Sequence, residues 1–146
     1  MNTAEIESFL RRNCSRDFQG VYSVDTLPDQ PKLLVCNTDP STKPGKHWIA
    51  IYVDKRGRGE YFDSFGRPPS TLFRRYLDKH CKTWIFNRRQ LQSVLSRFCG
   101  YYCCLFCVLR CRGVDMRRIV CQFPNDTSFN DVLVHSFVCK NKVLKM

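Results

Sequence analysis

The stretch SRFCGYYCCLFCVLRCR, residues 96–112, decides the fold, because it holds five of the chain's ten cysteines in a run that is otherwise largely apolar. Cys99, Cys103, Cys107 and Cys111 recur every four residues. On a helix they would form one slowly drifting stripe, with aromatic and aliphatic side chains covering the other faces. A helix that is apolar all round is buried all round, so the pattern predicts a central helix inside the protein.

The chemistry of the cysteines has several readings. A free cysteine packs as a small apolar side chain, and this core role is favoured for Cys103, Cys104, Cys107 and Cys111. A structural zinc ion needs four ligands that converge on one point, whereas one straight helix usually presents only two thiols to a single point. We therefore expect no metal site here.

Length and charge set the class of protein. At 146 residues the chain is expected to form one domain, residues 1–146, with enough core to fold without metal or disulfide staples. The longest uncharged run, residues 98–109, is too short for the roughly 20 apolar residues of a membrane span. The N-terminal segment has acidic residues and lacks the apolar stretch of a secretory leader, so a soluble, non-secreted protein in a reducing compartment, with most thiols free, is expected.

The formal net charge of +11 is spread over short basic clusters along the chain. This balance favours anionic partners, nucleic acid first. A solubilising surface is an equally good reading of scattered clusters.

Periodicity and turn signals predict an α+β domain with a central, mostly antiparallel sheet packed on the buried helix. The helix of residues 3–12 places Ile6, Phe9 and Leu10 on one face, with Thr3 as a candidate N-cap. A glycine-bearing turn pairs two of the expected strands, 47–54 and 60–65, as a hairpin. The other expected elements are strands over 32–37 and 82–87 and helices over 71–80 and 128–137.

Cys99 differs from the other cysteines of the run, because it lies where a basic, polar segment meets the apolar helix. A thiol in the first helical turn faces unpaired N–H groups and the positive end of the helix dipole, which favour thiolate. The sequence thus makes Cys99 a candidate nucleophile. The alternative is that it is simply the first core cysteine of the stripe.

A thiolate nucleophile needs an imidazole to move the proton, and the imidazole needs an acceptor that fixes its tautomer. His47 begins the strand HWIAIYVD, whereas His80 ends a helix and His135 lies in the terminal helix. In the expected hairpin, Asp63 at the end of the second strand lies beside His47. His47 and Asp63 are therefore the candidate base and its orienting acid, although Asp63 could instead cap a turn.

These residues carry a resemblance. The segments GKHWIAIYVD, YFDSFGRPP and LQSVLSRFCGYYCC, in this order, resemble the adenain-like cysteine proteases of adenoviruses, and more distantly the SUMO-deconjugating proteases that share their fold. The N-terminal segment EIESFLRRNCSRDFQGVYSVDTLP also fits, so the resemblance covers roughly residues 4–110. It implies a buried helix with the nucleophile at its N-terminus.

Carried over residue by residue, the resemblance makes Cys99 the nucleophile, His47 the general base and Asp63 its partner. Gln92 would be a side-chain donor to the oxyanion, beside the backbone N–H of Cys99. Gln90, two residues away, competes for this role. The acid is Asp where adenain has Glu, and SVLSRF separates Gln92 from Cys99, so the oxyanion loop differs from the family pattern.

The resemblance also implies a function. Such an enzyme would be a monomeric endopeptidase that cleaves viral or mobile-element precursor proteins after glycine, in Gly-Gly or Gly-x-Gly contexts, during particle maturation. It would act in the virion and in the host nucleus or cytoplasm, with no cofactor needed for the chemistry. DNA and a short viral peptide are the activators of adenain, and Cys81 aligns with the cysteine that holds the peptide by a disulfide. An unreactive thiol is the other reading of Cys81.

Two other functions remain open. A deconjugase of ubiquitin-like modifiers would use the same chemistry but needs an extended surface for a folded modifier. A non-enzymatic nucleic-acid-binding module explains the charge and the thiols, but gives no reason for the order His47, Asp63, Gln92, Cys99.

Overall fold

The computed structural model describes residues 1–14, 16–42 and 47–144. Its helices and strands follow one another along the chain as α1 (Thr3–Asn13), β1 (Phe18–Ser23), β2 (Leu33–Asn37), β3 (Trp48–Val53), β4 (Arg58–Phe62), α2 (Thr71–His80), β5 (Thr83–Phe86), α3 (Cys99–Cys111), α4 (Met116–Cys121) and α5 (Thr127–Leu144). Every helix and strand expected from the sequence is present, while β1 and α4 were not expected. The α+β class is confirmed.

The five strands form one sheet in the order β1-β2-β3-β4-β5. The expected hairpin is present as the antiparallel pair β3–β4, in which Ala50 lies opposite Phe62, and β2 also pairs with β3 in antiparallel fashion. Both edge pairs, β1–β2 and β4–β5, are parallel. The sheet is thus evenly mixed, and "mostly antiparallel" describes only its centre, because the edge strands return through longer connections.

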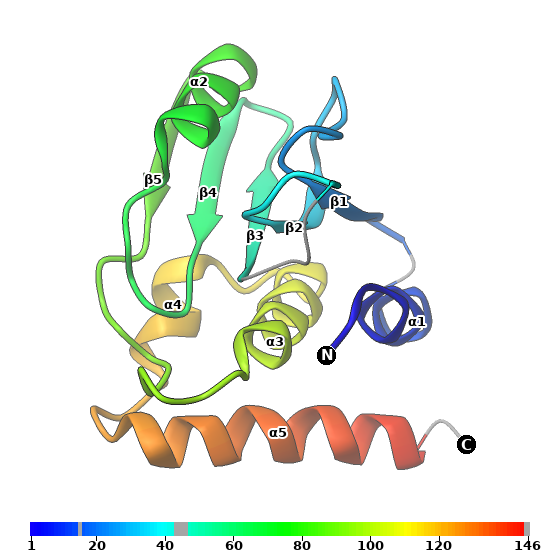
Figure 1. Ribbon diagram of the computed structural model, residues 1–146, viewed down its shortest axis with the longest axis vertical. Helices are drawn as coiled ribbons and strands as arrows, with labels where there is room; N and C mark the ends of the chain where they lie inside the picture. Colours follow the sequence, from blue (N-terminus) through cyan, green and yellow to red (C-terminus); the bar gives the residue numbers. More distant parts are fainter. Residues whose placement is uncertain (15, 43–46, 145–146) are drawn as a thin grey trace.

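Helices cover both faces of the sheet (Figure 1). Alternate residues of the central strands point to opposite faces. Leu33, Val35, Ala50 and Phe62 pack into the larger core with α1, α3 and α5. The side chains between them, such as Leu34 and Ile51, pack into a second core with Phe73 and Leu77 of α2. Burial on both faces explains why all five residues of β2 are buried.

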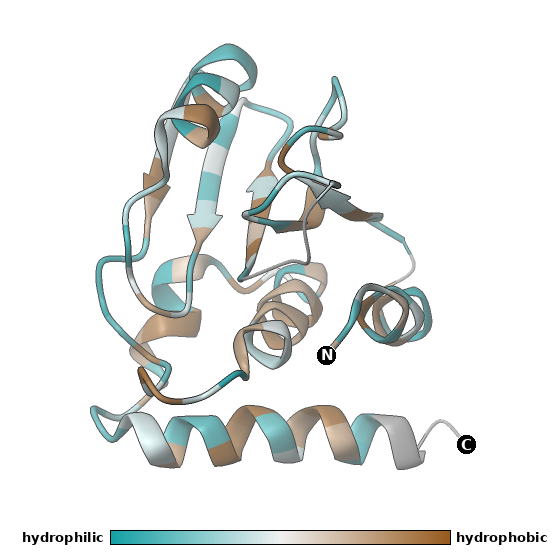
Figure 2. Ribbon diagram, in the orientation of Figure 1, coloured by the Kyte–Doolittle hydropathy of each residue, from teal (hydrophilic) through white to brown (hydrophobic). Residues whose placement is uncertain are grey.

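The predicted central helix is α3, which appears largely apolar along its length in Figure 2. Cys103, Cys104 and Cys107 are each 0% exposed, as expected for core cysteines. Gly100, directly after Cys99, lets α1 and β3 approach the first turn closely. A β-carbon at this position would lie 3.2 Å from Met1 Cβ and 3.4 Å from Trp48 Cδ1.

The expectation for Cys111 was wrong in one respect, because it is not a free core thiol. Cys111, the last residue of α3, forms a disulfide with Cys14, which follows α1, and the two Cα atoms are 6.0 Å apart. The bond links two helix ends that α1–α3 packing already brings together. The other eight cysteines are not disulfide-bonded, so most of the cysteines keep their thiols, as expected.

The first helix is capped differently from the expectation. Asn2, not Thr3, is the N-cap of α1. Its side chain accepts a hydrogen bond from the Glu5 N–H, and the Glu5 carboxylate accepts one from the Asn2 N–H, which together form a capping box. Ile6, Phe9 and Leu10 form the buried face, as expected. Within the described residues, no helix is both long enough and apolar enough to cross a lipid bilayer.

Candidate active site

Cys99 is the first residue of α3, and only 8% of its surface is exposed. No side chain caps this helix end, so the N–H groups of the first turn remain directed at the space around the thiol. The helix dipole adds partial positive charge at the same place. Cys99 is thus the one cysteine of the run that meets a polar environment suited to a thiolate.

His47 lies immediately before β3, and Asp63 immediately after β4. The hairpin brings them together as the sequence predicted, with His47 Nε2 2.7 Å from Asp63 Oδ1. Asp63 is buried, with 4% exposure, and the imidazole is largely covered. The imidazole also forms a side-chain hydrogen bond with Cys99.

The pKa values of Cys99 and His47 are shifted in the directions that favour an ion pair between them. Burial would raise the pKa of the Cys99 thiol, but the hydrogen bond and charge of His47, with the backbone N–H groups of Trp48 and Gly100, lower it below the ordinary cysteine value. Burial also opposes charge on His47, yet Asp63 and Cys99 outweigh it and raise the pKa of the imidazole to about 9. Near neutral pH this favours a thiolate beside an imidazolium.

The turn that follows β4 fixes the orientation of Asp63. The N–H of Phe65 donates to Asp63 Oδ1 at 2.8 Å, and the N–H of Gly66 donates to the Asp63 carbonyl at 2.7 Å. Gly66 has φ +72°, and a β-carbon there would lie 2.7 Å from the Arg89 main chain, so the position requires glycine. Asn87, directly after β5, accepts a hydrogen bond from the Asp63 N–H and donates one to the Asp63 carbonyl.

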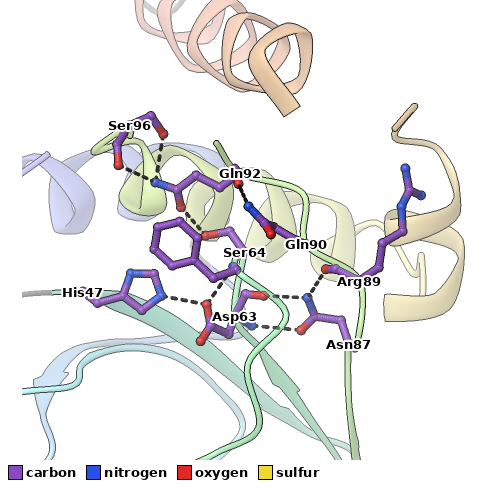
Figure 3. Close-up of polar contacts among 9 residues, drawn as sticks. His47, Asp63, Ser64, Asn87, Arg89, Gln90, Gln92 and Ser96 are labelled. Atoms are coloured by element: carbon purple, nitrogen blue, oxygen red, sulfur yellow. Dashed lines mark hydrogen bonds and ion pairs between the residues drawn. The ribbon is translucent and has the colours of Figure 1, made fainter. Parts of the chain in front are cut away.

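Gln92 reaches the same site from the loop before α3 (Figure 3). It is fully buried, and Ser64, the residue after Asp63, donates its hydroxyl to Gln92 Oε1 at 2.5 Å. The Gln92 amide nitrogen donates to the carbonyl and the hydroxyl of Ser96 at 3.1 and 3.0 Å. Gln90 instead lies exposed, with its amide directed at the Gln92 carbonyl.

His47, Gln92 and Cys99 line one cleft of about 440 Å³. The same cleft is also lined by Met1, Trp48, Phe65, Ser96 and Arg97. Trp48 is held by a hydrogen bond from its indole N–H to the Met1 carbonyl at 3.1 Å. Larger hollows occur elsewhere on the surface, but the lining of none of them includes Cys99 or His47.

The remaining candidates lie away from this cleft. Cys81 caps α2 and packs with the second core on the other face of the sheet, where a β-carbon at Gly59 would lie 2.5 Å from its sulfur. Burial raises the pKa of this thiol, and Asp78 and Asp54 raise it further. His80 contacts Tyr76 on α2, and His135 on α5 packs against Phe98 and Tyr101.

Sequence reasoning missed Asn87, Ser64, Phe65 and Ser96 as parts of the site. Ser64 and Phe65 stand inside the quoted motif YFDSFG, so their proximity to Asp63 was visible, but their contacts were not. Asn87 ends a strand whose parallel pairing with β4 was not foreseen. Within residues 1–14, 16–42 and 47–144, no group of three or more His, Cys, Asp or Glu side chains is arranged to hold a metal ion.

The chain resembles viral cysteine proteases in sequence. It is 50% identical to the cysteine protease of African swine fever virus over 48 residues, which are 31% of this chain and 18% of that protein. It is 26% identical to the protease of frog adenovirus 1 over 106 residues, which are 62% of this chain and 50% of that protein. The matches thus span half or less of these relatives' lengths. No protein-family model matches the chain.

Solved structures give the same picture of the fold. The crystal structure of the African swine fever virus protease superposes with a TM-score of 0.66 at 20% identity, over 92% of this chain and 66% of that one. The SUMO protease Ulp1 superposes with a TM-score of 0.50 at 14% identity, over 97% of this chain and 78% of that one. The chain therefore has the fold shared by viral cysteine proteases and the SUMO protease.

Proposed function

We propose that this chain is a cysteine endopeptidase that uses Cys99 as nucleophile, His47 as general base and acid, and Asp63 as the orienting partner. One arrangement carries the proposal. The thiol of Cys99, at a helix N-terminus, is hydrogen-bonded to the imidazole of His47, whose Nε2 lies 2.7 Å from the buried carboxylate of Asp63. Cys99 and His47 line one cleft, and Asp63 lies directly behind the imidazole. The similarity to named cysteine proteases supports it.

The chemistry follows from the geometry. The Cys99 thiolate attacks the carbonyl carbon of the scissile amide, which forms the C–S bond and places negative charge on the carbonyl oxygen. When this intermediate collapses, the C–N bond breaks and His47 gives its proton to the leaving amine. Water, deprotonated by His47, then hydrolyses the thioester and regenerates the thiol.

The oxyanion would be stabilised by the N–H of Cys99 and by the amide of Gln92. Gln92 suits this role because it lines the cleft and Ser64 fixes its amide oxygen. In this structure that nitrogen donates to Ser96. The Gln92 amide must therefore exchange at least one bond to Ser96 for a bond to the oxyanion during the reaction.

Substrate and setting extend the same proposal. We propose cleavage after glycine in Gly-Gly or Gly-x-Gly contexts of viral or mobile-element precursor proteins, in the virion or the infected cell, as the resemblance to adenain implies. Activation by DNA through the basic surface belongs to this proposal, since +11 of formal charge is available. Attachment of an activating peptide at Cys81 would require this thiol to leave its packing against Gly59 and to ionise despite its raised pKa.

The test is hydrolysis of synthetic peptides that contain Gly-Gly or Gly-x-Gly, with products identified by mass spectrometry and DNA present or absent. We expect cleavage after glycine by the native chain and none by Cys99→Ala or His47→Ala. Cys103→Ala is the matched control, because Cys103 lies one turn further along α3 and is fully buried. Hydrolysis that survives Cys99→Ala would overturn the proposal.

A further inference from the structure

A column of three side chains leads from the catalytic imidazole to the surface. The ring of Phe65 stacks on His47, with centroids 4.9 Å apart and planes inclined by 27°. The guanidinium of Arg67 lies over Phe65, 4.8 Å from the ring centroid. Since Phe65 is also bonded through its N–H to Asp63, Arg67 is held at a defined place beside the catalytic group.

A second arginine lies in the cleft itself. Arg97 is exposed and lines the cleft two residues before Cys99. Among the residues that the structure describes, no carboxylate forms an ion pair with the guanidinium of Arg67 or of Arg97. Both cations therefore keep their capacity to bind an anion.

Among the residues that the structure describes, no carboxylate lines the cleft, and the adjacent Asp63 is paired with His47. An extended substrate in the cleft therefore meets positive charge that the protein itself does not neutralise. Arginine binds carboxylates through a planar fork of N–H donors, often with two parallel hydrogen bonds.

The reaction decides which part of the substrate meets Arg67. His47 protonates the leaving amine, so the segment that departs with that amine crosses the imidazole and Phe65. We propose that Arg67, with Arg97, selects substrates that carry an acidic side chain within a few residues of the scissile bond, Arg67 contacting the leaving segment. This inference rests on the proposed endopeptidase function and adds to it a class of substrate.

The experiment compares kcat/KM for peptides identical except for Glu, Gln or Lys at one position, scanned across the first few positions on each side of the cleaved bond. We expect Glu to be preferred over Gln by about twofold to fivefold at a position after the bond, the size of an exposed ion pair. The preference should shrink as salt is added, because exposed charges are screened. Arg67→Glu should reverse it in favour of Lys, and Arg67→Gln should abolish it.

Arg75→Glu is the matched control, because it makes the same change in charge at an exposed site on α2 that does not line the cleft. It should keep the preference for Glu. Equal rates for Glu and Gln peptides, or a preference retained in both Arg67→Glu and Arg97→Glu, would overturn the inference and leave the protease function standing. Failure to cleave any peptide, with Cys99 unreactive toward a Gly-Gly vinyl sulfone, would overturn both.

Discussion

Asn87 binds the main chain of Asp63 on both sides. Its amide oxygen accepts the Asp63 N–H at 2.9 Å, and its amide nitrogen donates to the Asp63 carbonyl at 2.6 Å. Both residues are buried, and they stand at the ends of the parallel strands β5 and β4. The clamp thus fixes the residue that orients His47.

Replacing Asn87 by alanine should lower both stability and activity. The buried N–H of Asp63 would lose its partner, whereas the Asp63 carbonyl would keep the hydrogen bond from the Gly66 N–H. One unsatisfied buried group costs about 1–3 kcal/mol, so the free energy of unfolding should fall by about that amount. Urea denaturation measures this, and kcat on a cleaved peptide measures the loss of orientation. Asn125→Ala, at an exposed position, is the control. An Asn87→Ala variant as stable and active as the native chain would contradict the clamp.

The pH dependence of kcat/KM should be bell-shaped. As pH rises through the lowered pKa of Cys99, thiolate forms and the rate increases. As pH rises further, through the His47 pKa of about 9, the imidazolium that protonates the leaving amine is lost and the rate falls. Asp63→Asn should move the alkaline limb to lower pH, because Asp63 helps to raise the His47 pKa. An alkaline limb unchanged in Asp63→Asn would contradict this assignment.

Gln92 and Gln90 should differ sharply when each is replaced by alanine. Loss of one oxyanion donor typically lowers kcat about a hundredfold to a thousandfold, so Gln92→Ala should be severely impaired while Cys99 remains reactive. Gln90→Ala should be nearly unaffected, because its side chain is exposed and does not line the cleft. Steady-state kinetics with both variants decide between the two glutamines. Equal losses would point to a general disturbance of the loop.

The Cys14–Cys111 disulfide should stabilise the fold under oxidising conditions. The bond closes a loop with a sequence separation of 97, and its loss in Cys14→Ser/Cys111→Ser should cost about 2–5 kcal/mol in the free energy of unfolding. In reductant the native chain and the double variant should unfold alike. Alkylation of the denatured, unreduced protein should label eight thiols, whereas labelling of all ten would show that the bond is absent.

Local sequence patterns were enough to predict much of the fold. The four-residue spacing of cysteines predicted α3, and the glycine turn with flanking strands predicted the hairpin that joins His47 to Asp63. The parallel edge pairs could not be foreseen, because pairing between distant strands depends on tertiary packing and leaves no short-range signal. For the same reason, the contacts of Asn87 with the main chain of Asp63 could not be predicted.

The candidate residues of the site could be chosen from the sequence because they follow one another in a characteristic order. His47, Gln92 and Cys99 line one cleft and Asp63 binds His47, whereas the contacts of Gln92 with Ser64 and Ser96 depend on how two loops meet. The disulfide was missed because spacing cannot show that Cys14 and Cys111 lie at neighbouring helix ends.

The most direct test of the central claim is covalent labelling by a peptide vinyl sulfone that ends in Gly-Gly, read by intact mass and peptide mapping. We predict one label, on Cys99, which is lost in Cys99→Ala and strongly slowed in His47→Ala because the thiolate loses its stabilising imidazolium. Cys103→Ala should label like the native chain. Labelling at other cysteines at similar rates, or labelling of Cys99 that is indifferent to His47→Ala, would contradict the claim that this pair is the catalytic centre.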